Sequence, residues 1–181
     1  ANASGVLSTG APGPLSINTA DLAPQVTSEV NSVLNLDSTN TALLAANFDM
    51  DDPQTYHDST AVSVYDSLGN SHTLQTFYVK TAPGTWNVFA SLDGAAAFTP
   101  TPNTLTFDTS GAIDTTTTTL PLSVGPLALT TGAANLSFTL GFSGTTQFGS
   151  AFSVNALDQD GYTSGRLSGF GIDDDGVIQG R

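Results

Sequence analysis

Alternating apolar and polar positions dominate the middle of the chain. Segments with this two-residue period, rich in β-branched and aromatic residues, lie at 60–67, 72–81, 84–92 and 135–142. The segment 84–92, for example, places Trp86 and Val88 on one face and Phe89 on the other. This combination is typical of half-buried antiparallel strands, so the pattern predicts an antiparallel β structure.

Helical patterns are almost absent. The chain has one Glu and one Lys among residues that favour helices. The best candidate, "TNTALLAANF" at 39–48, is short and predicts at most one or two helical turns.

The connections between the predicted strands share one turn chemistry. "YDSLGN", "FDTSGAI" and "IDDDGVI" each place a Gly two or three residues after an Asp and just before a new segment. The Asp side chain can bond its own backbone in a turn, and Gly accepts the positive φ at the end of the turn. These stretches therefore predict short hairpin loops.

Other segments are low in complexity. The Thr- and Pro-rich stretches 95–104 and 114–129 predict excursions around the sheet or edge strands with irregular ends, because Pro is confined to edges and bends. We expect a β-rich outer domain over 39–149, barrel-like or sandwich-like. It would be inserted into a second, smaller β domain assembled from 1–38 and 150–181.

Charge excludes several partners. The net charge is −13, and the only basic residues besides histidine are Lys80, Arg166 and Arg181. Binding of nucleic acid or anionic lipid needs a basic surface, which three residues cannot make. The chain has no cysteine for a disulfide or a thiolate metal site. No run of about 18 apolar residues is present to span a membrane.

The acidic stretch 158–180 raises the question of calcium. An EF-hand loop needs Asp at its first position and Glu at its twelfth. With Gly161 at position six, those two positions hold Ala156 and Leu167, and with Gly176 at position six the twelfth residue is missing. We interpret the aspartates as turn residues and expect no metal and no cofactor.

No arrangement of residues predicts catalysis. His57 and His72 are interpreted as surface histidines, and neither a phosphate loop nor a third zinc ligand accompanies them. The aromatic side chains of two adjacent strands could form either core or a stacking platform for sugar, and core is favoured; they are Phe77, Tyr78, Trp86 and Phe89.

Three stretches together resemble the bacterial flagellar hook protein family. They are "TAVSVYDSLGNSHTLQTFYVKTAPGTWNVF" at 60–89, "LTFDTSGAI" at 105–113 and "QDGYTSGRLSGFGIDDDGVIQGR" at 159–181. Asp160 stands where Asn is common in the family. The motif residues that carry the resemblance are Tyr65, Asp66, Gly69, Asn70, Trp86, Asp160, Gly161, Tyr162, Gly165, Leu167, Ile172, Asp175, Gly176, Ile178 and Gly180.

The resemblance implies an extracellular structural protein, not an enzyme. Hook subunits polymerise into a curved, flexible tube that acts as a universal joint between motor and filament, beside rod and hook-filament junction proteins. The family's terminal helices have no counterpart here, since no apolar heptads occur at either end. We therefore expect a monomeric fragment. Two alternatives stay open at this point: an extracellular β-sandwich binding module, such as an adhesin or a carbohydrate-binding domain, and a secreted hydrolase.

Overall fold

The computed structural model describes residues 21–166, 169–172 and 178–180. The chain divides into two compact units. The larger unit is Ala23–Ser164, and the smaller one takes in both ends, up to Leu22 and from Gly165 onward. Among the described residues, no helix has the length and apolar character needed to cross a membrane.

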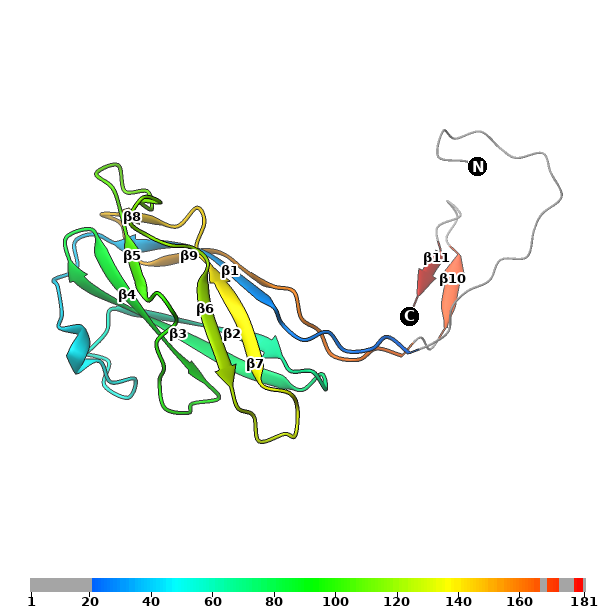
Figure 1. The fold of residues 1–181 in the computed structure, drawn as a ribbon. Coiled ribbons are helices and arrows are strands. Elements are labelled where there is room, and N and C mark those ends of the chain that lie inside the picture. The colour runs from blue at the N-terminus through cyan, green and yellow to red at the C-terminus, as the bar shows by residue number, and fades with distance from the viewer. Residues whose placement is uncertain (1–20, 167–168, 173–177, 181) are drawn as a thin grey trace, which may run out of the picture. The chain divides into compact units, whose positions relative to one another are not determined.

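The first sheet of the larger unit is antiparallel, with the order β2-β3-β4-β5 (Figure 1). The strands are β2 Asp58–Tyr65, β3 Ser71–Ala82, β4 Thr85–Leu92 and β5 Thr104–Thr106. The three longer strands lie where the alternation predicted them, so that prediction is confirmed.

The second sheet has the order β6-β7-β1-β8, with β9 also paired to β1. Its strands are β1 Glu29–Asp37, β6 Leu122–Leu127, β7 Leu136–Gly141, β8 Thr146–Phe148 and β9 Ser153–Gln159. The segment 135–142 is confirmed as β7, and the stretch 114–129 contains the edge strand β6. Strand β1 departs from the antiparallel prediction, because it pairs in parallel with β7 and β8. Parallel neighbours need a long crossover, and the first sheet lies within the segment that links β1 to β7.

One hydrophobic core joins the two sheets. Leu34 and Leu36 of β1, with Leu140 of β7, pack in the same buried cluster as Tyr78 of β3 and Trp86 of β4. The ring of Tyr78 meets that of Phe142 edge-on, with centroids 6.2 Å apart. The predicted all-β architecture is therefore confirmed, and the larger unit consists of two packed sheets.

The opposite face of the first sheet is covered by the connection from β1 to β2. Phe48 stacks on Phe89 with ring centroids 4.1 Å apart, and Phe48 and Tyr56 both meet Phe77 edge-on. This connection holds η1, a single 3-10 turn at Ala45–Asn47, within the segment predicted to be briefly helical. It explains why strand β3 is buried on both faces at its centre.

Three of the four aromatic residues are core, and the fourth, Phe89, is half-buried beneath Phe48. Trp86 is fully buried, and its Nε1 donates to Gln147 Oε1 at 2.5 Å. Phe77 and Tyr78 are also buried. A stacking platform needs open ring faces, which these three buried residues do not offer, so the carbohydrate-binding alternative is not favoured.

In the smaller unit, β10 Phe170–Ile172 pairs antiparallel with β11 Ile178–Gly180. Leu22 forms an isolated antiparallel bridge with Gly165. Both ends of the chain thus contribute to this unit. The strands β1 and β9 belong to the larger unit, outside the range 39–149, and the domain boundaries at 39 and 149 stay a prediction.

Candidate functional site: a buried carboxylate–histidine network

The turn between β2 and β3 is built by the predicted Asp-to-Gly chemistry. Asp66 N–H donates to Asn70 O at 3.0 Å, and Gly69 N–H donates to Asp66 O at 3.0 Å. Gly69 has φ of 82°, a left-handed conformation that favours glycine. Tyr65, which ends β2, is half-buried.

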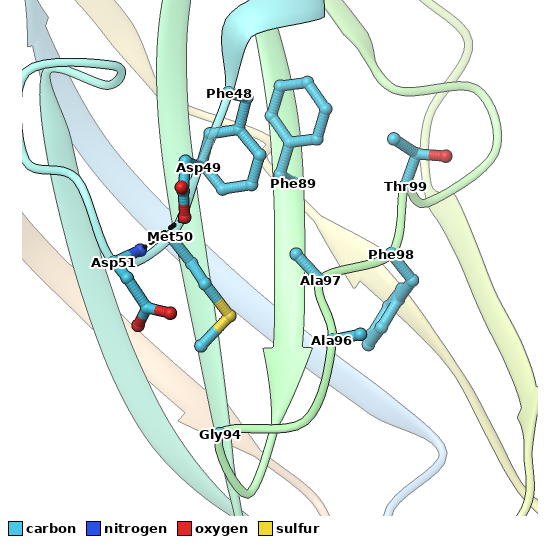
Figure 2. A pocket seen from close by; sticks show the side chains of 10 residues that line it. All are labelled: Phe48, Asp49, Met50, Asp51, Phe89, Gly94, Ala96, Ala97, Phe98 and Thr99. Carbon is cyan, nitrogen blue, oxygen red and sulfur yellow. Dashed lines mark hydrogen bonds between the residues drawn. The ribbon is translucent and has the colours of Figure 1, made fainter.

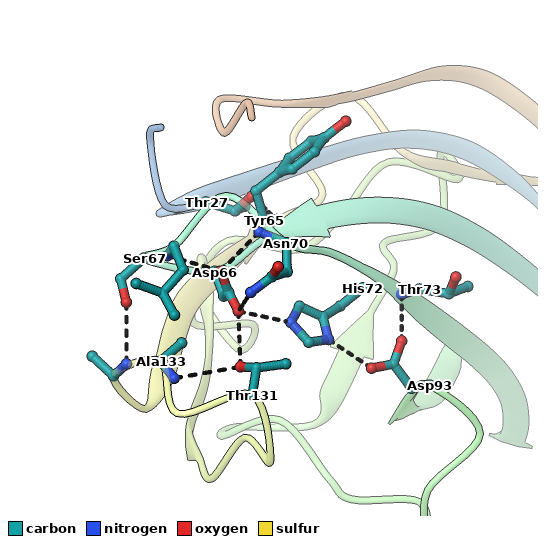
Figure 3. A network of polar contacts seen from close by, with 12 residues as sticks. Thr27, Tyr65, Asp66, Ser67, Asn70, His72, Thr73, Asp93, Thr131 and Ala133 are labelled. Atoms are coloured by element: carbon teal, nitrogen blue, oxygen red, sulfur yellow. Dashed lines mark hydrogen bonds and ion pairs between the residues drawn. The ribbon is translucent and has the colours of Figure 1, made fainter. Parts of the chain in front are cut away.

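The carboxylate of Asp66 is fully buried and accepts five hydrogen bonds (Figure 3). Oδ1 accepts from the backbone N–H groups of Leu68 and Asn70, at 2.8 and 2.9 Å. Oδ2 accepts from the Asn70 side chain at 2.8 Å, from Thr131 Oγ1 at 3.0 Å and from His72 Nε2 at 3.2 Å. Burial alone would raise the pKa of Asp66, but the hydrogen bonds from Asn70, His72 and Leu68 outweigh it and hold the pKa well below its usual range.

His72 lies between two carboxylates. Its Nδ1 is 2.6 Å from Asp93 Oδ2, and its Nε2 faces Asp66. Burial alone would lower the pKa of His72, but the hydrogen bonds and negative charges of Asp93 and Asp66 raise it. The interpretation of His72 as a surface histidine is wrong, because residue 72 shares the inward face of β3 with Leu74 and only 6% of its surface is exposed.

Asp93 closes the network from the turn after β4. Its Oδ1 accepts the N–H of Thr73 at 2.7 Å, and its own N–H donates to Thr73 O at 2.9 Å. Burial alone would raise the pKa of Asp93, but the hydrogen bonds from His72 and Thr73 lower it. Asp93 has φ of 53°, which is uncommon for a residue with a side chain.

His57 has the opposite surroundings. Its Nδ1 accepts the N–H of Lys80 at 3.1 Å, and its Nε2 lies 2.8 Å from Thr41 O. The rings of His57 and Trp86 form an edge-to-face pair with centroids 5.4 Å apart. The side chain is half-buried, so His57 lies at the surface with both ring nitrogens in contact with backbone groups.

A second group of motif residues follows β9. Asp160 Oδ1 accepts the N–H groups of Ser28 and Glu29, at 2.8 and 3.0 Å, and its Oδ2 accepts the Ser28 hydroxyl. Gly161 is buried against Thr27, and its N–H donates to Gln159 Oε1 at 2.6 Å. Asp160 thus fixes the start of β1 from the far end of the sequence.

The two groups of motif residues meet in space. Tyr65 N–H donates to Thr27 Oγ1 at 2.9 Å, and Thr27 N–H donates back to Tyr65 O at 2.9 Å. A Cβ added at Gly69 would lie 2.7 Å from Pro24 Cβ and 3.4 Å from Thr163 Cα. Tyr162 pairs with Gln25 through backbone hydrogen bonds in both directions. Segments about 90 residues apart in sequence therefore interlock at one end of the larger unit.

The remaining motif residues lie elsewhere. Trp86 is in the core, Gly165 bridges to Leu22, and Ile172, Ile178 and Gly180 belong to the β10–β11 hairpin. Leu167, Asp175 and Gly176 lie outside the described residues, as does most of the predicted "IDDDGVI" turn.

The network does not have the arrangement of a catalytic site. A general base needs a ring nitrogen free to take a proton from a nucleophile or water, and both nitrogens of His72 face carboxylates. Within the described ranges, no three His, Cys, Asp or Glu side chains are grouped so as to hold a metal ion. What the network can do is tie together the turns at 66–70 and 93 and the loop at 131.

An open groove of about 800 Å³ lies between the segment 48–51, strand β4 and the segment 94–99 (Figure 2). Phe48, Met50, Phe89 and Phe98 line it together with the carboxylates of Asp49 and Asp51. Among the described residues that line the groove, Thr99 has the only hydroxyl group and no side chain is a base other than the two carboxylates. The groove offers no constellation for acid–base chemistry.

Fold and site together define a β-rich structural domain. Its most extensively hydrogen-bonded side chains, the carboxylates of Asp66, Asp93 and Asp160, stabilise turns and strand ends. Residues 35–162 match the family model of the flagellar basal body protein FlaE D2 domain, so the chain belongs to that family. It is 30% identical over 177 residues to the flagellar hook protein FlgE of Salmonella typhimurium, covering 93% of this chain and 42% of the relative. It is 37% identical over 126 residues to FlgE of Rhizobium meliloti, covering 66% of this chain and 30% of the relative.

The crystal structure of Helicobacter pylori flagellar hook protein FlgE2 has a similar fold. Its TM-score is 0.59 at 10% identity, over 93% of this chain and 68% of that one. The chain spans less than half the length of the curated relatives it matches.

Proposed function

We propose that this chain is part of a structural subunit of the bacterial flagellar hook, the curved tube that transmits motor torque to the filament. The family match over residues 35–162 carries this proposal, because it covers nearly all of the two packed sheets. The subunit assembles with copies of itself, next to rod and hook-filament junction proteins. It acts outside the cell and catalyses no reaction.

The interlocked turns support a mechanical role. A subunit that transmits torque must keep its shape while its contacts with neighbours change. Asp66 and Asp160 each accept hydrogen bonds from two backbone N–H groups of turns and strand ends. Such charge-assisted hydrogen bonds are stronger than neutral ones, so they stiffen the end of the unit where the chain enters and leaves.

A discontinuous domain organisation is also part of the proposal. The sequence predicted an outer domain over 39–149 and an inner domain built from both ends. The pairing of β1 with β7, β8 and β9 supports a division further out, near residues 22 and 165. The β10–β11 hairpin and the Leu22–Gly165 bridge would then belong to the inner domain.

The test is immunogold electron microscopy of whole cells with an antibody raised against this chain. Label confined to the short curved segment at the base of each filament would support the proposal. Label over the cell body, or absence of label from flagella, would overturn it. A strain lacking the gene controls for antibody specificity.

A further inference from the structure

We propose that His72 carries a proton on both ring nitrogens and links the carboxylates of Asp66 and Asp93 through hydrogen bonds. Loss of one of these protons at alkaline pH would then release the turn at Asp93. A neutral imidazole has one N–H and one lone pair, whereas the imidazolium has two N–H groups. Both nitrogens of His72 face carboxylate oxygens, at 2.6 and 3.2 Å. Only the imidazolium satisfies both contacts, since a neutral ring would direct a lone pair at one carboxylate.

Among the residues that the structure describes, no other proton donor reaches these two contacts. The titratable groups that face His72 are Asp66, from the turn after β2, and Asp93, from the turn after β4. On β2, the residue opposite is Val64. The segment 126–130, which lines an apolar cavity of about 380 Å³ beside the ring, offers no titratable side chain.

The two carboxylates differ in what they can do when the ring loses its proton. Asp66 is fully buried and its carboxylate cannot turn into water, so the remaining N–H of His72 stays with it. The side chain of Asp93 is 50% exposed and can turn into water. Because Asp93 has a positive φ that its side-chain contacts with His72 and Thr73 help to hold, this turn is the part that loosens. Asp93 and Ala95 also line the apolar cavity, so its wall changes with pH.

The same chain contains an internal control. His57 accepts the N–H of Lys80 at Nδ1, which requires a lone pair there, and donates from Nε2 to Thr41 O. The contacts of the two rings therefore differ: His57 has one backbone N–H donor and one carbonyl acceptor as partners, whereas both nitrogens of His72 face acceptors.

Nuclear magnetic resonance of the ¹⁵N-labelled chain tests this assignment, because ring nitrogen shifts distinguish N–H from a lone pair. His57→Gln and His72→Gln variants assign the two rings. Two protonated nitrogens on His72 at pH 7, with a titration that Asp93→Asn moves to lower pH, are expected. A His72 ring with one bare nitrogen at pH 7 would overturn the proposal.

Amide hydrogen exchange tests the release itself. Above the titration of His72, exchange at residues 93–95, corrected for the intrinsic effect of pH, should rise roughly tenfold or more, as expected for loss of a charged hydrogen bond. In the His72→Gln variant the corrected exchange rate should not change over the same pH range. Equal corrected exchange rates at residues 93–95 in the wild type below and above the titration would refute the proposal that protonated His72 holds this turn.

Discussion

Replacing Gly161 with Ala adds one methyl group at the point where the two groups of motif residues interlock. The new Cβ would lie 2.8 Å from the backbone N of Thr27 and also against its hydroxyl oxygen. Thr27 is fully buried, and backbone atoms cannot move aside as the end of a flexible side chain can. The segment that carries Thr27 must therefore shift.

The cost follows from what Thr27 holds. Its hydroxyl accepts the N–H of Tyr65 and donates to Gln159 Oε1, both at 2.9 Å. Losing these two bonds costs about 1 kcal/mol each, and more if a buried group is left without a partner. Overpacking adds about 1–3 kcal/mol. We expect Gly161→Ala to lower the free energy of unfolding by about 3–5 kcal/mol, which for a chain of this size lowers the melting temperature by about 6–20 °C.

Urea unfolding followed by circular dichroism measures this change, with Gly149→Ala as the matched control. A Cβ at Gly149 would meet its nearest atoms, in Ser38 and Thr39, only at 3.7 Å, an ordinary contact distance. The control should therefore stay within about 0.5 kcal/mol of the wild type. Equal unfolding midpoints for the two variants would refute the argument that Gly161 is required by its contact with Thr27.

Two further predictions concern the carboxylates. Asp160→Asn should lower the free energy of unfolding by less than about 1 kcal/mol, because the amide oxygen can still accept the N–H groups of Ser28 and Glu29. Asp160→Ala removes this acceptor and should lower the free energy of unfolding by about 2 kcal/mol. Similar losses for the two variants in urea unfolding would contradict this prediction. The pKa values of Asp66 and Asp93 are lowered in the folded protein, so the stability they contribute is present above about pH 4 and is lost as pH falls further. Unfolding free energies measured at pH 6 and pH 3 should therefore differ more for the wild type than for Asp66→Asn, and an equal difference would show that Asp66 is not the group responsible.

Local patterns predicted the elements that obey a two-residue period. Strands β2, β3, β4 and β7 follow from alternation, and the turn at Asp66 follows from its Asp and Gly. Strand β9 was missed because its residues are mostly exposed or half-buried and show no clear alternation. The parallel pairing of β1 could not be predicted, because register between distant segments depends on the packing of the whole unit.

The histidine network was missed for a different reason. His72 continues the inward-facing series of Leu74, Thr76 and Tyr78, so the two-residue period already placed it toward the core. The surface interpretation of His72 is therefore at odds with its own position in the strand pattern. The partner Asp93 is 21 residues away, and only the pairing of β3 with β4 brings it to the ring.

Gly69 and Gly161 test whether the two motifs form one structural unit. Both lack a Cβ where the same short segment, 24–27, fills the space: Pro24 lies against Gly69 and Thr27 against Gly161. If a methyl group at either position displaces this segment, the second methyl group meets a space that is already open. The double variant Gly69→Ala/Gly161→Ala should then lose less stability than the sum of the two single variants. We expect a coupling of at least about 0.5 kcal/mol in a double-mutant cycle. If the stability losses of the two single variants add up to that of the double variant within about 0.3 kcal/mol, the two glycines avoid separate clashes. The two motifs would then pack against segment 24–27 independently of each other.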